Sequence, residues 1–496
     1  MTNLLPKIAF PELFFGLVAP IGANIDTSIA ALKENLESFD YEVVDIRVTD
    51  LFPKFIATIK PEVPLKEKPK CDRYQTYIQY GNQLRKKFED NSILAMAAMY
   101  QVAEKRKEIM EANSAELPTK IAYVMRQFKR PEEIELLRSV YGEQFFQISI
   151  YSRRDFRVQH LSENFAKDEG LVNPDVKKSI AENLVLTDEN EDGSNGQKVG
   201  KIFHHADLII DADEVKEEFN ASKQVERFTK LLFGSNSISP SRYEYGMKLA
   251  KSAALRSIDL SRQVGAAIFS KTGQIISLGS NEVPKAGGGS YWDKEGKDAR
   301  EYSLGVDSNE ERKRELLSEV MEIFNLKVTQ EIKEKLNNAQ LMDALEYGRV
   351  VHAEMSAITD AARGGLAVKD SVLYCTTFPC HMCAKHIIAA GISKVIFLEP
   401  YPKSLVGRQH IDSIDVEGKN RGKYKEYTSV KFVHFYGVTP KRFDELFYRG
   451  KRKNNIGQYE KYTSLPATPM LTIRNLAYLD VEHQVVEGAT NNIFKS

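Results

Sequence analysis

The chain has 496 residues, of which 42% are hydrophobic and 28% are charged. This length exceeds one ordinary core and predicts two or three domains in a soluble globular protein. Lys and Arg number 69, as do Asp and Glu, so no net charge draws the chain to nucleic acid or to an anionic membrane. Four cysteines form no disulfide framework, and no apolar run has the length of a signal-peptide core or a membrane span. We therefore expect a cytoplasmic protein that is not bound to a membrane.

The N-terminal half alternates strand-like and helix-like segments. The strand-like runs are residues 12–18, 41–46, 121–124, 145–150 and 206–211. Alternation of this kind predicts an α/β domain with a mainly parallel sheet that helices cover on both faces.

The first of these runs leads into a glycine-containing turn and then into a helical pattern. A phosphate-binding loop occurs in this context. The N-terminal half resembles the P-loop nucleotide-kinase fold, and the resemblance implies a nucleotide at Gly16, Gly22, Ala23 and Asn24. Ala23 and Asn24 replace the Lys and the Ser or Thr that contact phosphate and Mg²⁺ in that family. We expect a degenerate phosphate loop with a structural or nucleotide-sensing role.

One His and two Cys in the C-terminal half have the residue types and the order of a metal site. His352 and the pair Cys380 and Cys383 supply three ligands for tetrahedral Zn²⁺ and leave the fourth position open for water. Pro379 suits the first turn of a helix, which would place both sulfurs on one face. Glu354 lies two residues after His352, so the two side chains converge on one water only at the start of a helix. Taken alone, the cysteine pair fits a structural zinc site or two core thiols equally well.

The complete pattern, H-x-E followed by P-C-x-x-C, resembles the cytidine/deoxycytidylate deaminase superfamily. The resemblance implies a Zn²⁺ cofactor held by His352, Cys380 and Cys383, with Glu354 as the catalytic proton carrier. Glu354 would take a proton from water, give it to N3 of cytosine and then move a proton to the leaving ammonia. The product would be a deoxyuridine nucleotide.

Two further segments match deoxycytidylate deaminases. Residues 261–266 read S-R-Q-V-G-A, and residues 279–281 read G-S-N. The resemblance implies that Asn281 hydrogen-bonds the sugar hydroxyl of the nucleotide, and it adds Ala353 to the substrate contacts.

Tyr401 and Lys403 follow a strand-like run at 393–398. Residues that leave the carboxyl end of such a strand border the site. Tyr401 could stack on the pyrimidine or sugar and Lys403 could meet a phosphate, or both could be rim residues.

The sequence predicts three parts. Residues 1–235 form the P-loop-like domain, and residues 236–450 form a three-layer αβα deaminase-like domain. An insertion at 282–347, with glycines at 287–289, predicts a lid or an oligomer contact. Residues 451–496 form a C-terminal tail.

This pairing of domains resembles bacterial deoxycytidylate-deaminase-like proteins that act in phage defence as dCTP deaminases. The resemblance implies dCTP as substrate with dCMP as a second one, a homo-oligomer, and an inhibitor that restrains the activity. Two alternatives remain. A deaminase of RNA or DNA bases would favour a basic, aromatic-interleaved stripe, which the sequence lacks. A non-catalytic nucleotide sensor with structural zinc would have no use for Glu354.

Overall fold

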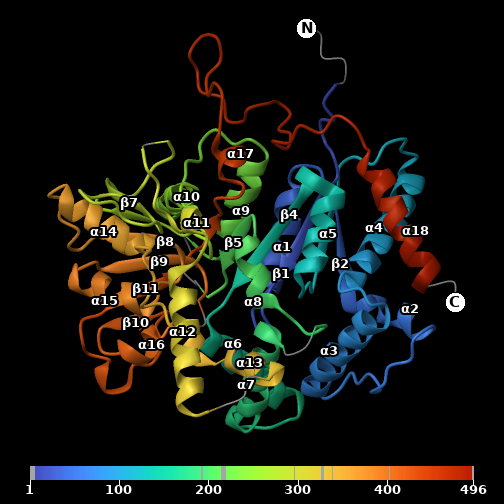
Figure 1. Ribbon diagram of the computed structural model, residues 1–496. Helices are drawn as coiled ribbons and strands as arrows, with labels where there is room; N and C mark the ends of the chain where they lie inside the picture. The colour runs from blue at the N-terminus through green and yellow to red at the C-terminus, as the bar shows by residue number, and fades with distance from the viewer. Residues whose placement is uncertain are drawn as a thin grey trace. The chain divides into compact units, whose positions relative to one another are not determined.

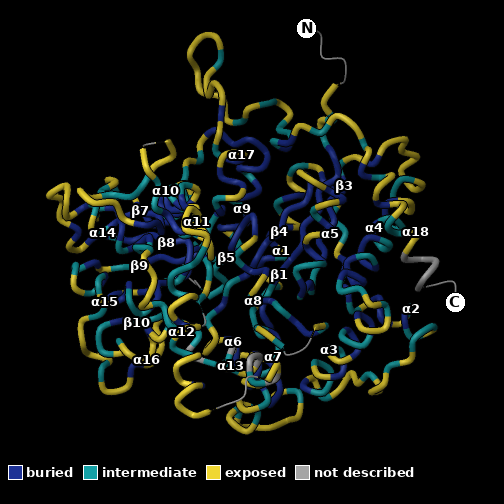
Figure 2. Tube along the Cα trace, in the orientation of Figure 1, coloured by how far each residue is buried: buried dark blue, intermediate teal, exposed yellow. Residues whose placement is uncertain are grey.

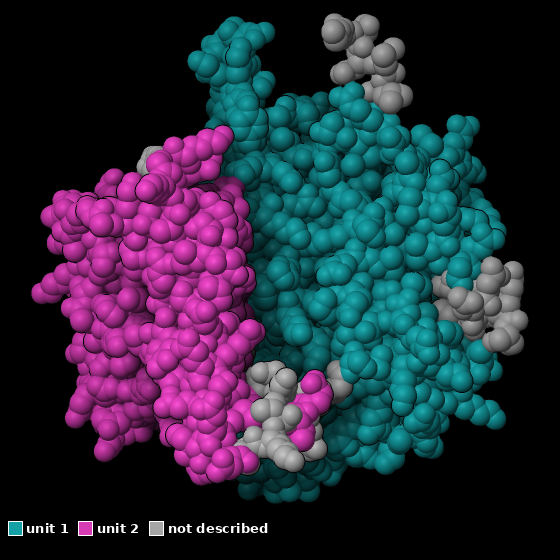
Figure 3. All heavy atoms as spheres, viewed as in Figure 1, with its two compact units in different colours: residues 1–240, 436–496 teal, residues 241–435 magenta. Residues whose placement is uncertain are grey.

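The structure is a computed structural model, and it describes residues 6–191, 194–213, 219–294, 296–325, 329–337, 339–401 and 403–493. The chain divides into two compact units, which Figure 3 colours separately. Unit 1 comprises residues 1–240 and 436–496, and unit 2 comprises residues 241–435. No helix in the described ranges is both long enough and apolar enough to cross a membrane.

Unit 1 is built on a six-stranded sheet in the order β12-β5-β4-β1-β3-β2 (Figure 1). The strands are β1 (Leu13–Val18), β2 (Glu42–Arg47), β3 (Ile121–Arg126), β4 (Phe145–Tyr151), β5 (Leu208–Asp211) and β12 (Gly437–Val438). All neighbouring pairs are parallel except β12, which runs antiparallel to β5. Every residue of β1 is buried, because β1 has a strand on each edge and helices on each face.

Helices cover both faces of this sheet. They are α1 (Asp26–Glu37), α2 (Phe52–Ile56), α3 (Lys70–Lys87), α4 (Ile93–Asn113), α5 (Pro131–Tyr141), α6 (Arg154–Asp168), α7 (Lys178–Asn190), α8 (Val199–Ile202), α9 (Ala221–Leu232), α17 (Phe443–Phe447) and α18 (Tyr478–Ile493). Leu13, Phe15 and Leu17 of β1 share a core with α1 and α9. Phe14 points to the opposite face, as the two-residue period of a strand requires, and stacks on Tyr141 of α5 at a centroid distance of 3.7 Å. The covered parallel sheet that the sequence predicts is confirmed.

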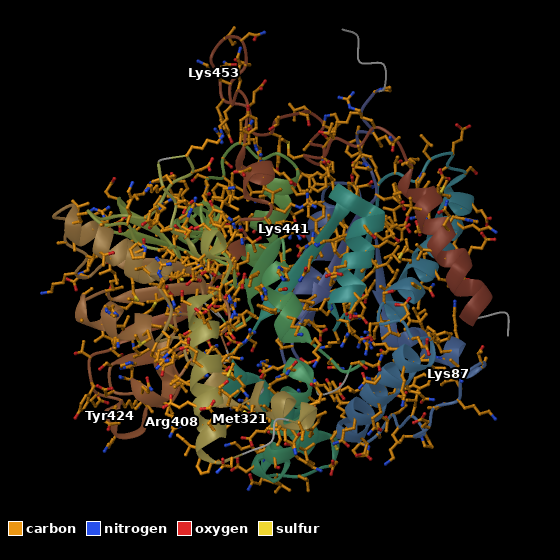
Figure 4. All side chains as sticks on the ribbon, viewed as in Figure 1. Lys87, Met321, Arg408, Tyr424, Lys441 and Lys453 are labelled. Atoms are coloured by element: carbon orange, nitrogen blue, oxygen red, sulfur yellow. The ribbon has the colours of Figure 1, made fainter. Side chains whose placement is uncertain are left out.

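The chain returns to unit 1 at residue 436, which differs from the predicted domain end at residue 450. β12 extends the sheet edge, and buried Arg442 then fixes the segment. Its Nε donates to Asp207 Oδ1 at 3.2 Å, and a terminal nitrogen donates to the carbonyl of Phe145 at 2.9 Å. Figure 4 labels Lys441 beside it. Burial lowers the pKa of Lys441 to about 8. A two-residue strand and a lone arginine give no periodic signal in the sequence.

The predicted C-terminal tail also belongs to unit 1. It begins with an exposed loop that carries Lys453, labelled in Figure 4, and it ends in α18. The Tyr478 hydroxyl at the start of α18 donates to the buried carboxylate of Glu12. The segment therefore contributes to the core of unit 1.

Unit 2 has a second six-stranded sheet, in the order β10-β11-β9-β8-β6-β7. The strands are β6 (Gly265–Phe269), β7 (Ile275–Ser280), β8 (Val372–Thr377), β9 (Lys394–Glu399), β10 (Ile414–Val416) and β11 (Val430–His434). β6 is antiparallel to both β7 and β8, and the remaining pairs are parallel. In each unit the sheet strands contain much of the buried chain (Figure 2).

Helices again lie on both faces of the sheet, which confirms the three-layer αβα arrangement. α10 (Arg242–Ala254) and α14 (Ala353–Arg363) pack on the sheet, and α15 (His381–Ala389) packs beside α14. The other helices of unit 2 are α11 (Glu301–Leu304), α12 (Ser308–Ile323), α13 (Gln330–Asn337) and α16 (Val406–Gln409). α14 packs very closely on β7, where a Cβ on Gly279 would lie 2.1 Å from the carbonyl oxygen of Ala353. The missing side chain of Gly279 thus sets the distance between the sheet and the start of α14.

The insertion at 282–347 is mainly helical in its described part. α12 carries Met321, which is buried and is labelled in Figure 4. α13 ends at Asn337, and a short 3₁₀ turn lies at Gln340–Asp343.

Candidate metal centre and active site

Two helices of unit 2 begin at the candidate site. His352 is the N-cap residue of α14, and Glu354 lies in the first turn of that helix. Cys380 is the N-cap residue of α15, and its sulfur accepts a hydrogen bond from the backbone N–H of Cys383 at 3.5 Å. Helix N-termini favour negative charge and therefore favour thiolates. Glu354 lies at a helix start, as the sequence predicts, whereas Pro379 precedes the N-cap of α15 instead of lying in its first turn.

Three side chains converge at these helix starts. Nδ1 of His352 lies 3.3 Å from Sγ of Cys380 and 3.4 Å from Sγ of Cys383. The three ligand atoms all lie within 4.8 Å of one another. Among the described residues, this is the group of His, Cys, Asp or Glu side chains that could hold a metal ion. Ordinary Zn–S and Zn–N bonds at a tetrahedral angle place S and N about 3.6 Å apart. The donor set and its spacing therefore fit Zn²⁺, with one position left open.

The charges of these groups also suit a metal. A hydrogen bond from Cys383, together with the neighbouring His352, lowers the pKa of Cys380 to about 4 despite burial. Burial lowers the pKa of His352, but the hydrogen bond and charge of Cys380 outweigh it and raise that pKa to about 9. The lowered pKa of Cys380 favours its thiolate, which is the form that binds a metal ion.

Glu354 lies against this group without belonging to it. Its side chain is buried, and one carboxylate oxygen is 3.3 Å from Sγ of Cys383. The other oxygen accepts from the thiol of Cys375 on β8, also at 3.3 Å. Burial raises the pKa of Glu354. A buried carboxyl group with a raised pKa beside a metal position can both accept and donate a proton.

Cys375 is a functional neighbour that the sequence did not reveal. Burial raises its pKa well above the ordinary thiol value, so it stays protonated and can donate to Glu354. It is therefore a positioning residue for the carboxylate. No motif contains it, and only the pairing of β8 with β6 brings it to the site.

A cavity of about 230 Å³ opens at the metal group within unit 2. Phe378 and Tyr401 supply aromatic walls, while Arg262, Asn281 and Thr377 supply polar groups. Pockets of this type, mostly apolar with a few placed polar groups, bind small molecules.

Three of the four predicted substrate contacts line this cavity: Ala353, Asn281 and Tyr401. Asn281 also holds the cavity wall, because its Oδ1 accepts from the backbone N–H of Val264 and its Nδ2 donates to the carbonyl of Arg262, both at 2.7 Å. One amide hydrogen and one lone pair remain for a ligand.

Lys403, the fourth, does not line the cavity. It forms an ion pair with Asp343 at 2.5 Å, and its side chain is largely exposed.

Arg262 is the cation that the sequence did not single out. It lines the cavity, with its guanidinium carbon 5.6 Å from the ring centroid of Tyr401. It is part of the S-R-Q-V-G-A segment, so a signal existed. Besides Glu354, three carboxylates line the cavity, from Asp259, Glu301 and Asp307, and these lie in segments without a motif.

In unit 1, the predicted nucleotide residues lie along β1 and the turn after it. Gly16 is inside the strand, and a Cβ there would lie 2.6 Å from Cζ of Phe145. Gly22 has φ +86°, and a Cβ there would lie 2.7 Å from the carbonyl oxygen of Arg157. Ala23 donates its backbone N–H to the carbonyl of Pro20. Packing and turn geometry therefore account for both glycines, and the P-loop role of this turn stays a prediction.

A family model supplies the assignment of unit 2. The model described as "Cytidine and deoxycytidylate deaminase zinc-binding region" matches residues 240–399, which contain His352, Glu354, Cys380 and Cys383. The chain therefore contains, at residues 240–399, a zinc-binding region of the cytidine/deoxycytidylate deaminase superfamily. Zn²⁺ is accordingly its cofactor, in agreement with the donor set above.

Relatives of this superfamily agree with the match. The chain is 28% identical over 198 residues to a probable deoxycytidylate deaminase of Drosophila melanogaster, covering 39% of this chain and 78% of that protein. It is 30% identical over 155 residues to a deoxycytidylate deaminase of Pongo abelii, covering 31% of this chain and 63% of that one. The match to the deoxycytidylate deaminase of phage T4 is 42% identical over 57 residues, which is 12% of this chain and 30% of that protein. In the last two matches, the chain thus covers less than two thirds of the length of the relative.

Solved deaminases also align with the chain. The dCMP deaminase of cyanophage S-TIM5 in apo form aligns at 19% identity and a TM-score of 0.23, over 40% of this chain and all of that one. A likeness this distant carries no argument about substrate.

Proposed function

We propose that the protein hydrolytically deaminates deoxycytidine nucleotides, dCTP and dCMP, to deoxyuridine nucleotides. The observation that carries the proposal is a buried carboxylate, Glu354, held beside a His/Cys/Cys group in a cavity with aromatic walls. The names of the sequence relatives support a cytosine nucleotide. The choice of dCTP, and depletion of dCTP in antiviral defence, follow from the domain pairing and belong to the proposal.

The reaction replaces the C4 amino group of cytosine by the oxygen of water and releases ammonia. Bound at this site, Zn²⁺ supplies a Lewis acid that lowers the pKa of a water molecule toward neutrality. Glu354 takes a proton from the water, delivers it to N3 and then carries a proton to the leaving amino group. Cys375 donates a hydrogen bond to one oxygen of Glu354 and so orients the carboxylate.

Other residues of the cavity hold the substrate. Phe378 and Tyr401 present aromatic faces to the pyrimidine and exclude water. Asn281 has one donor and one acceptor left for the sugar. Arg262 is the cation for a phosphate, and its planar guanidinium suits two phosphate oxygens. The carboxylates of Asp259, Glu301 and Asp307 repel a free triphosphate, so dCTP would enter as its Mg²⁺ complex.

Replacing Cys380 by Ser should remove the zinc. The protein should contain about one zinc per chain, and the variant should lose it because an alcohol is not deprotonated at neutral pH and binds Zn²⁺ poorly. Metal analysis after dialysis measures the content. Cys375→Ser is the matched control, since Cys375 is equally buried but lies outside the ligand group. Full zinc occupancy in Cys380→Ser would place the metal elsewhere.

Ammonia release from dCTP, dCMP, deoxycytidine, CTP and single-stranded DNA and RNA tests the substrate. We expect activity on dCTP and dCMP, and Arg262→Gln should lower kcat/KM for both by about 10- to 100-fold while leaving deoxycytidine unaffected. Lys403→Gln is the control, because Lys403 does not line the cavity.

Other outcomes would refute the assignment. If Lys403→Gln is the damaging variant, phosphate binds at the rim rather than at Arg262. Activity confined to RNA or DNA would assign the protein to the base deaminases. The absence of ammonia from every substrate, with zinc in place, would make the site a structural one.

A further inference from the structure

Unit 1 contains a cavity of about 190 Å³, close in volume to the deaminase cavity. Its walls come from the turn after β1, from Arg126 at the end of β3, and from α2 and α3. Open α/β sheets bind ligands outside the carboxyl ends of their parallel strands, which is where this cavity lies. The proposed deaminase reaction makes no use of it.

The turn after β1, beside the cavity, already binds a carboxylate from elsewhere in the chain. Asp188 of α7 is fully buried, and its Oδ2 accepts from the backbone N–H of Ile21 at 2.7 Å. Its Oδ1 accepts from Nζ of Lys129 at 2.6 Å, and the same Nζ donates to the carbonyl of Ala19 at 2.8 Å. A phosphate at this turn would have to displace a buried, paired carboxylate. A ligand of unit 1 therefore has to bind beside the turn, in the cavity.

Four residues that line the cavity each have one buried polar atom without a hydrogen-bond partner within the described part of the chain. These atoms are Nε of Arg85, Nε of Arg126, Oγ1 of Thr49 and Oε1 of Gln197. The side chain of Arg85 is only 2% exposed. Buried polar groups without a partner are rare in folded proteins. The walls of this cavity thus have hydrogen-bonding capacity that the described chain does not use.

The charge of the cavity wall favours an anion. Four cations line it, Arg73, Arg85, Arg126 and Lys129. Arg85 forms a buried ion pair with Glu133, and Lys129 pairs with Asp188, so Arg73 and Arg126 are the two cations for a ligand. Arg73 and Arg126 form ion pairs with Glu67 and Asp45, whose side chains are 73% and 43% exposed. Exposed pairs of this kind contribute little stability, so phosphate oxygens can replace these carboxylates.

The same cavity has an aromatic wall. Phe52 and Tyr77 line it with their rings stacked at a centroid distance of 5.5 Å, and Tyr74 lines it as well. Arg73 lies over the ring of Tyr77 at 4.3 Å, next to this wall. Aromatic faces bind the flat ring of a base, and guanidinium groups bind phosphate.

We propose that this cavity is a second nucleotide site, which binds a nucleoside monophosphate. Its base lies against Phe52 and Tyr77, and its phosphate replaces the exposed carboxylate partners of Arg73 and Arg126. The Asp188–Lys129 pair stays in place and keeps phosphate off the turn after β1. The site is separate from the deaminase cavity in unit 2 and does not depend on the deaminase reaction.

Equilibrium dialysis of the full-length, zinc-loaded protein tests this site. The probes are AMP and dTMP, with adenosine, thymidine and inorganic phosphate as partial ligands. At least one nucleotide should bind saturably and at least 10-fold more tightly than its nucleoside and than phosphate. Arg126→Gln and Arg73→Gln should each weaken that nucleotide about 10- to 100-fold. Tyr77→Ala should reduce the difference in affinity between the nucleotide and inorganic phosphate.

Lys54→Gln is the matched control. Lys54 also pairs with a carboxylate, Glu104 at 2.6 Å, and lies over a ring, Tyr100 at 4.7 Å, but it does not line the cavity. It should bind nucleotide like the parent protein, and circular dichroism should show each variant folded. The proposal is overturned if neither nucleotide binds, if phosphate binds as tightly as the nucleotide, or if Arg262→Gln abolishes binding while Arg126→Gln does not.

Discussion

Glu354→Gln should retain zinc and fold while its kcat on a deoxycytidine nucleotide falls by about 10²- to 10⁴-fold. This is the range for loss of a positioned general acid or base. The amide has nearly the shape of the carboxylate and can still accept from Cys375, so the packing around the metal group should persist. Zinc analysis and ammonia release on the same preparation measure both quantities.

Asp360→Asn is the control for a charge change on the same helix. Asp360 lies on α14 beyond the first turn and pairs with Arg363 near the solvent at 3.0 Å. Its replacement should leave turnover within about twofold of the parent, since surface changes of this kind have small effects. A Glu354→Gln variant that turns over at the parent rate would show that another group carries the proton.

The metal site was predictable because its signal is local. The spacings H-x-E and C-x-x-C each span less than one helical turn, so two helix starts determine most of the geometry. The position of Glu354 followed from the same spacing, because its side chain can lie beside the His/Cys/Cys group only from the first turn of α14, where it is found.

Contacts between residues far apart in the sequence were not predictable. Cys375 contacts Glu354 only because β8 lies beside β6 in the sheet. Arg442 contacts a carbonyl 297 residues earlier in the chain, so no local pattern could assign residues 436–496 to unit 1. The same holds for Asp188, which reaches the turn after β1 from 167 residues away. Arg262 is the exception, because it lay within a recognised segment.

The Glu12–Arg106–Glu482 cluster in unit 1 should be the most sensitive point for stability. Nε of Arg106 on α4 donates to both oxygens of Glu12 at 2.9 Å, and a terminal nitrogen lies 2.9 Å from Glu482 of α18. The two carboxylate side chains are 0% and 2% exposed. Burial raises the pKa of Glu482, and the charge of Arg106 opposes that shift. One guanidinium thus holds two buried carboxylates, which join α18 to the rest of the unit.

Arg106→Met should lower the free energy of unfolding of unit 1 by about 3–5 kcal/mol, because it leaves buried carboxylates without a counter-charge. Hydrogen exchange read peptide by peptide should show the loss in β1, α4 and α18, since it reports each segment separately. Lys107→Met is the matched control: Lys107 is the next residue of α4 and its side chain is 77% exposed, so its effect should stay within about 0.5 kcal/mol. Glu482→Gln should lower the free energy of unfolding far less than Arg106→Met, because it keeps the Arg106–Glu12 pair. If hydrogen exchange in these segments is equally slow in Arg106→Met and Lys107→Met, the buried cluster does not hold α18 in place.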